Sequence, residues 1–318
     1  MVKNMKKLWQ IVFLLLLFPA SSFGGTILFQ ENFEDTNLSS RGWYDVSGVA
    51  LSTVEHISGS VSSFECRFLL GGRNCSGGSP SRHIFTATDE VYISYYVKYS
   101  TNYTGSNRGY HPHEFYIITN ENTNYVGPAY THLTAYVEQN EGTPALSLQD
   151  GENIDLTRIN QDLTNITESR SIAGCNGVPT VESPTYIDCY RAGSVYWNDK
   201  TWRANQIYFQ DVPGVYYKNN WHKVEAYFKL NTVSGGKGQS DGIIRYWYDG
   251  NLIIERTNII MRTAQHPNMK FNQLLISPYI GDGSPVDQTM WIDDLTVATS
   301  IIQSSNLPPS PPQNLNFP

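Results

Sequence analysis

The chain has 318 residues, of which 40% are hydrophobic, 13% aromatic and only 16% charged. This composition excludes a coiled coil, which needs many Ala, Glu, Lys and Leu. It also excludes a disordered chain, because there are enough apolar side chains to bury a large core. The formal net charge of −7 argues against a nucleic-acid binder that needs a basic face. Length and composition favour one large all-β or α/β domain over two average ones.

Residues 1–24 have the pattern of a secretory signal peptide. Three lysines precede the apolar run Leu8–Phe18, and Pro19 is followed by small residues suited to a signal peptidase. The run is shorter than the roughly 20 residues of a membrane-spanning helix. We therefore expect a secreted protein, extracellular or periplasmic, with no membrane span after cleavage. An uncleaved N-terminal anchor is the alternative. Cleavage removes three bases and no acid, so 19 bases (22 − 3) would face 29 acids, giving a charge near −10.

Short β-type runs separated by Gly, Asn, Ser and Pro clusters recur along the rest of the chain. Runs of this length and spacing, with no long helical period, predict an all-β fold, a two-sheet antiparallel jelly-roll sandwich over residues 25–302. Residues 152–202 alternate weakly and predict an insertion, and residues 303–318 predict a proline-rich tail. The predicted strands are Thr26–Phe33, Ser62–Leu70, Val91–Ser100, Glu114–Thr119, His132–Gln139, Trp221–Asn231, Gly242–Asp249, Asn251–Arg256, Phe271–Tyr279 and Met290–Thr299. The first and last of them should be neighbours.

Four cysteines follow the signal segment, and an even number in an exported chain predicts disulfides. The sequence-local pairs Cys66–Cys75 and Cys175–Cys189 are expected among the three possible pairings. A zinc site is the weaker alternative, because no pair has the CxxC spacing.

Three predicted strands combine an apolar face with one that bears Tyr, Lys, Glu and His. In Trp221–Asn231, for example, Val224, Ala226 and Phe228 alternate with charged or tyrosine side chains. Tyrosine rings stack on sugar C–H faces, while charged side chains bind hydroxyls and carboxylates, so this pattern favours a carbohydrate groove over an ordinary exposed sheet face.

Residues 220–299 contain motifs that resemble a known family. They are the segments NNWHKVEAYFKLNT, DGIIRYWYDG and WIDDLTV. Together they resemble the concanavalin A-like jelly-roll polysaccharide lyases, of the alginate and glucuronan lyase type. Asp249-Gly250 within the second segment predicts a tight hairpin turn. The family's lysine loop is not found after Val91–Ser100, where Arg108 and His113 stand instead. The E-x-D-x-x-E strand of the related glycoside hydrolases is missing too, which disfavours paired-carboxylate hydrolysis.

The resemblance implies β-elimination on a uronate-containing glycan. This reaction needs a donor for the carboxylate, a base for the C5 proton and an acid for the leaving oxygen, and Tyr and His commonly act as base and acid. If the three polar strand faces lie on one concave sheet, nearby cations would lower the pKa of a tyrosine. The expected catalytic residues are Tyr227, His132, Lys229 and Tyr136. The expected substrate-binding residues are Tyr96, Lys98, Arg108, His113, Glu138, Lys223 and Glu225. Cross-strand polar ladders without catalysis are the alternative role.

No cofactor is required for this chemistry, but a structural Ca²⁺ is plausible between the first and last strands. Glu31 or Glu34 with Asp293 or Asp294 would supply the carboxylates, and we place the metal on Glu34 and Asp293. A metal at His111 and His113 is a weaker possibility. The predicted partner is a polysaccharide, with no nucleic acid, and the predicted state is a monomer. A non-catalytic glycan-binding or adhesion module of the same fold is the competing function.

Overall fold

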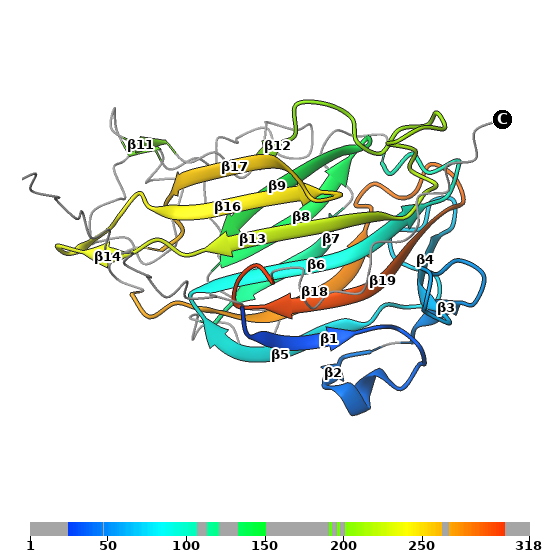
Figure 1. The fold of residues 1–318 in the computed structure, drawn as a ribbon, viewed down its shortest axis with the longest axis horizontal. Coiled ribbons are helices and arrows are strands. Elements are labelled where there is room, and N and C mark those ends of the chain that lie inside the picture. The colour runs from blue at the N-terminus through cyan, green and yellow to red at the C-terminus, as the bar shows by residue number, and fades with distance from the viewer. Residues whose placement is uncertain are drawn as a thin grey trace, which may run out of the picture.

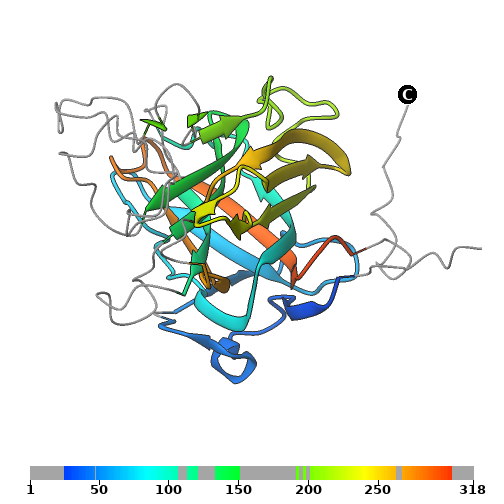
Figure 2. The same ribbon diagram turned by 90° about the vertical axis from the view of Figure 1, so that its left-hand side faces the viewer.

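The computed structural model describes residues 25–46, 48–106, 113–120, 133–150, 191–192, 196–197, 201–262 and 267–302. Two antiparallel sheets, here sheet A and sheet B, stack face to face (Figures 1 and 2). The predicted all-β jelly-roll sandwich is confirmed. The expected signal peptide, most of the expected insertion and the tail from residue 303 lie outside the described residues. In the part of the chain that is described, no helix has the length and hydropathy of a membrane span.

Sheet A has eight strands. Their order is β17 (Asn251–Ile259), β16 (Gly242–Tyr248), β13 (His222–Lys229), β6 (Glu90–Tyr99), β19 (Gln288–Ala298), β4 (Ser63–Phe68) and β3 (Ala50–Ser52), and β1 (Ile27–Glu31) pairs with β19.

Sheet B has seven strands. Their order is β12 (Thr201–Arg203), β9 (Thr143–Asp150), β8 (Leu133–Asn140), β7 (His113–Thr119), β18 (Phe271–Tyr279), β5 (Ser81–Thr88) and β2 (Trp43–Tyr44). The remaining described elements are one 3-10 helix, η1 (Leu38–Arg41), and the two-residue strands β10 (Arg191–Ala192), β11 (Tyr196–Trp197), β14 (Val233–Ser234) and β15 (Lys237–Gly238).

The core lies between the sheets and follows the alternation of the sequence. On β13, Val224, Ala226 and Phe228 are fully buried in it, as predicted. Tyr95 of β6 stacks on Phe115 of β7 with ring centroids 4.0 Å apart, which joins the two sheets at their centre. The intervening side chains therefore lie on the outer faces of the sandwich.

The chain ends and the first disulfide are arranged as predicted. β1 pairs antiparallel with β19, with Phe29 opposite Val297 and Glu31 opposite Leu295. Cys66 and Cys75 form a disulfide with their Cα atoms 4.8 Å apart. Cys175 and Cys189 lie outside the described residues. At the β16–β17 turn, Asp249 and Gly250 both have positive φ (47° and 78°), the conformation of a type I′ hairpin.

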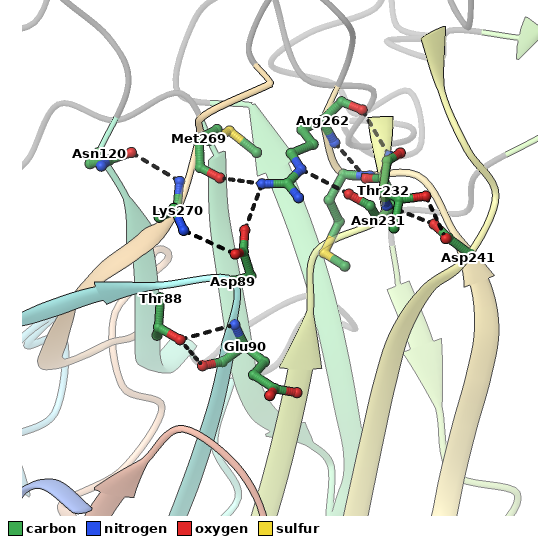
Figure 3. Close-up of polar contacts among 11 residues, drawn as sticks. Thr88, Asp89, Glu90, Asn120, Asn231, Thr232, Asp241, Arg262, Met269 and Lys270 are labelled. Atoms are coloured by element: carbon green, nitrogen blue, oxygen red, sulfur yellow. Dashed lines mark hydrogen bonds and ion pairs between the residues drawn. The ribbon is translucent and has the colours of Figure 1, made fainter. Parts of the chain in front are cut away.

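A buried arginine fixes one end of the sandwich (Figure 3). The guanidinium of Arg262 donates to Asp89 Oδ1, to the Asn231 carbonyl and to the Met269 carbonyl, each at 2.8 Å. Asp89 precedes β6 in sheet A, and it also accepts from Lys270 Nζ at 2.9 Å, just before β18 in sheet B. Connections of both sheets are therefore held at one carboxylate.

Candidate functional site

Six of the expected site residues lie on the outer face of sheet A. Across the β6–β13 pair, Lys223 lies opposite Tyr96, and Glu225 lies two positions farther along. Lys223 contacts Glu225 at 3.2 Å, and Lys98 donates to Glu55 at 2.6 Å. The six residues are Tyr96, Lys98, Lys223, Glu225, Tyr227 and Lys229. Lys98, Lys223 and Glu225 are thus paired with opposite charges, and Tyr96 lies beside them. This arrangement fits the alternative role, a cross-strand polar ladder without catalysis.

The expectation that nearby cations lower the pKa of Tyr227 is wrong. Its hydroxyl donates to Glu90, and the nearby cation is Arg245 on β16. Burial raises the pKa of Tyr227 well above its usual range, and the Glu90 carboxylate raises that pKa further, against a smaller lowering by Arg245. Neighbouring tyrosines behave alike, since burial raises the pKa of Tyr92 and of Tyr96. The described part of this face thus shows no tyrosine with a lowered pKa.

The expectation that all these strands share one sheet is also wrong. Tyr136 and Glu138 lie on β8, which belongs to sheet B, so they are on the opposite outer face from Tyr227 and Lys229. Arg108 and His132 lie outside the described residues, as does the side chain of His113. The structure therefore divides the predicted site between two faces. The catalytic roles assigned to these residues remain predictions.

The outer face of sheet B presents a continuous line of side chains across its strands, here called the transverse row. Register alone places its members opposite one another from β2 at one edge to β12 at the other. The members are Tyr44, Arg82, Leu275, Tyr116, Tyr136, Ser147 and Thr201. Seven strands separated by about 4.8 Å make the row about 29 Å long. It is long enough for several sugar residues of an extended chain.

Three residues at the β2 edge form a cluster, here called the Tyr44 cluster: Tyr44, Arg82 and Gln273. Gln273 donates from Nε2 to the Tyr44 hydroxyl at 2.5 Å, and Arg82 is ion-paired with Asp45. Burial raises the pKa of Tyr44 to about 12, against a smaller lowering by the positive charge of Arg82. Tyr44 is therefore a protonated donor at neutral pH.

Two polar atoms of this cluster are buried with no partner among the described residues, Gln273 Oε1 and Arg82 Nε. Gln273 as a whole is only 3% exposed. Buried polar groups are normally hydrogen-bonded, so the unmade acceptor of Gln273 and the unmade donor of Arg82 are exceptions within this cluster.

The middle of the transverse row is aromatic, and the carboxylate of Glu138 lies beside it. Tyr116 and Tyr136 meet edge to face with ring centroids 5.0 Å apart. Glu138 accepts from the Ser147 hydroxyl at 2.8 Å, and Tyr136 is only 8% exposed. Burial and the Glu138 carboxylate hold the pKa of Tyr136 above its usual range. Ring faces beside a carboxylate are a common arrangement for binding sugars.

The predicted metal residues Glu34 and Asp293 do converge. The Ser60 hydroxyl lies 2.7 Å from Glu34 Oε1 and 3.2 Å from Asp293 Oδ1. Backbone N–H groups of Val61 and Ile57 also donate to these carboxylates. Asp293 is fully buried, and burial raises its pKa to about 6. Among the described residues no group of three or more His, Cys, Asp or Glu could hold a metal, so a cation here would need hydroxyl, carbonyl or water oxygens as well.

No protein-family profile matches the chain, and no curated protein matches it either. Among solved structures, an alginate lyase from Chlorella virus is 11% identical with a TM-score of 0.48, over 85% of this chain and 100% of that one. A marine PL-14 alginate lyase from Aplysia kurodai is 14% identical with a TM-score of 0.48, over 86% and 100%. An endo-β-1,4-glucuronan lyase from the fungus Trichoderma reesei is 13% identical with a TM-score of 0.47, over 86% and 96%.

A ligand-binding domain of botulinum neurotoxin serotype D, in complex with N-acetylneuraminic acid, is 14% identical with a TM-score of 0.34. It matches 80% of this chain and 41% of that one. The structures found thus include lyases of the class that the sequence motifs resemble. At these identities and scores, the likeness decides neither the activity nor the substrate of this chain.

Proposed function

We propose that this protein is a secreted, carbohydrate-active jelly roll that binds an acidic polysaccharide along the transverse row and cleaves it by β-elimination. The observation that supports this most is the Tyr44 cluster. It places an arginine, a protonated tyrosine and a glutamine with an unmade acceptor at one end of an aromatic row.

Each residue of the cluster suits one requirement of the reaction. The guanidinium of Arg82 would neutralise the uronate carboxylate, which makes the C5 proton more acidic. Gln273 Oε1 would accept a hydrogen bond from a sugar hydroxyl. Tyr44 would donate its proton to the leaving oxygen as the C4–O bond breaks and the C4=C5 double bond forms. The base that takes the C5 proton is not assigned among the described residues, and His132 stays the prediction from sequence.

A specific observation favours the competing function, a glycan-binding module without catalysis. The pKa values of Tyr44, Tyr116 and Tyr136 on this face are all raised above the usual range. None of these three tyrosines is therefore prepared to act as a base, whereas protonated tyrosine side chains are common in sugar-binding sites.

The first experiment distinguishes the two functions with a panel of acidic polysaccharides. Purified protein is incubated with alginate, glucuronan and hyaluronan, and the ultraviolet absorbance of the unsaturated product is followed. Binding is measured in parallel by affinity electrophoresis in each polysaccharide. We expect product from at least one of the three. Binding without product would support the glycan-binding module. The absence of both product and binding would refute both functions.

Paired substitutions then locate the site. Tyr44→Phe and Arg82→Gln should each lower the rate at least tenfold, because each removes one group from the reacting end of the row. Tyr227→Phe on sheet A is the matched tyrosine control and should leave the rate within twofold. Circular dichroism melts verify that each variant is folded. A large loss in Tyr227→Phe with unchanged Tyr44→Phe would place the site on sheet A.

We also propose that Glu34, Ser60 and Asp293 hold a structural Ca²⁺. The convergence of two carboxylates on one hydroxyl supports this, because Ca²⁺ takes six to eight oxygen ligands. The ion would contribute stability and no step of the reaction.

A further inference from the structure

A pocket of about 560 Å³ lies at the end of the sandwich remote from Arg262, where β6 ends and the β8–β9 hairpin turns. Its walls come from the end of β6 (Tyr99), the loop that follows it (Tyr103), the hairpin (Gln139, Glu141 and Gly142) and the 207–218 loop. This volume is within the usual range of small-molecule sites. No member of the transverse row lines the pocket, so it is a separate feature of the fold.

The wall contains a buried ammonium group with unused capacity. Lys218 is only 4% exposed, and its Nζ donates to the Tyr103 carbonyl at 2.6 Å and to the Asp211 carboxylate. An ammonium has three N–H donors, so one remains for a ligand. Among the described residues the buried Tyr103 hydroxyl, on the same wall, has no hydrogen-bond partner. The Lys218 ammonium thus has one N–H without a partner, and the Tyr103 hydroxyl has no partner among the described residues.

The rest of the wall fits a sugar ring. Tyr99 and Phe209 cross at 78° with centroids 5.0 Å apart, which forms an apolar corner. Gln210 adds an exposed amide and Glu141 a carboxylate. The charged residues of the described wall are Lys218, Asp211 and Glu141. The wall therefore has no net positive charge and does not favour an anion. An aromatic corner with amide, ammonium and carboxylate groups suits an uncharged, hydroxylated ring.

We propose that this pocket binds one neutral sugar residue, as a site separate from the one proposed on sheet B. The inference concerns Lys218, Gln210 and the aromatic corner, and it does not depend on whether the protein is a lyase. A chain with such a site would hold a neutral sugar while the transverse row holds an acidic glycan.

The test is ligand-observed NMR with the methyl glycosides of glucose, galactose and mannose, and with glucuronic acid for comparison. We expect saturation transfer to at least one neutral glycoside, with a dissociation constant in the millimolar range. Val212→Trp places a bulky side chain at the mouth, because Val212 lines the pocket and is 69% exposed on its loop. This variant should weaken binding at least tenfold without altering the core.

Two further variants complete the design. Lys218→Met should weaken the same binding, and Val212→Trp keeps the test decisive if Lys218→Met does not fold. Arg82→Gln, on sheet B, should leave it unchanged, which separates this site from the proposed lyase face. The proposal is overturned if no neutral glycoside binds and the pocket holds only water, if Val212→Trp binds as well as the parent, or if glucuronic acid alone binds.

Discussion

Glu114 is a carboxyl group enclosed between the sheets. It is 2% exposed, and Tyr99 donates a hydrogen bond to it at 2.7 Å. Burial, with a smaller contribution from the Glu138 carboxylate, raises the pKa of Glu114 to about 8, although hydrogen bonds from Tyr99 and Gln139 oppose the shift. The residue is therefore mainly protonated at neutral pH, although in an unfolded chain it would be ionised.

This shift predicts a pH-dependent cost to stability. The folded pKa lies above the unfolded value of 4.5, so the folded state binds the proton more tightly, and stability falls as pH rises from about 4.5 to about 8. Glu114→Gln removes this cost. In urea unfolding the variant should gain up to about 4 kcal/mol over the parent at pH 8 and little at pH 4. An equal difference at both pH values would contradict the raised pKa.

At the scale of elements, alternation identified the buried side of each strand but not the sheet to which the strand belongs. Val91–Ser100, His132–Gln139 and Trp221–Asn231 show the same apolar and polar alternation, yet the first and third form β6 and β13 of sheet A and the second forms β8 of sheet B. A strand's partners depend on pairing between distant segments, which local periodicity does not encode. The divided site follows from this limit.

The Tyr44 cluster was missed for a related reason. Its residues come from three segments far apart in sequence, and Tyr44 lies in a strand of only two residues. β5, which contributes Arg82, has the mixed sequence SRHIFTAT and shows no clear alternation. Only the register of β2, β5 and β18 brings the three side chains together. The sequence shows that Arg82 is a cation, but it does not show which side chains surround it.

The Arg262 network predicts a large effect of a single substitution on the joint between the sheets. Arg262→Met would leave the carbonyls of Asn231 and Met269 without their donor and remove one of the two cations on Asp89. We expect a loss of about 2–4 kcal/mol in the free energy of unfolding, measured in urea.

Arg256→Ala is the matched control, because Arg256 is exposed on β17, next to the same connection. It should change stability by less than about 0.5 kcal/mol. Lys270 keeps one partner for Asp89 in both variants. If Arg262→Met and Arg256→Ala cost the same, the buried network does not stabilise the joint.

At the scale of the whole molecule, the sequence predicted the features that depend on composition and short range. These are the two-sheet fold, the Cys66–Cys75 bridge and the hairpin at Asp249-Gly250. It also predicted one long-range pairing, between the first and last long strands, β1 and β19. Both strands belong to sheet A, so both ends of the domain are held in one sheet.

The proposed Ca²⁺ site lies where these ends meet. Glu34 follows β1, Asp293 belongs to β19, and the loop containing Ser60 lies between them in space. A cation bound to all three would bind the folded state alone and so raise the melting temperature with its concentration. We expect CaCl₂ to raise the melting temperature by several degrees over an EDTA-treated sample, and MgCl₂ to do less, because Mg²⁺ needs a stricter octahedral geometry.

Asp293→Asn and Glu34→Gln should each abolish the dependence on Ca²⁺, whereas Glu255→Gln, an acid paired with Arg245 on the surface of sheet A, should keep it. The variants also separate a specific site from general screening by salt, since screening would act on all three proteins alike. Equal melting temperatures of the parent in CaCl₂ and in EDTA would show that no Ca²⁺ joins the two carboxylates. The chain ends would then be held by strand pairing and by the hydrogen bonds that Ile57, Ser60 and Val61 donate to Asp293 and Glu34.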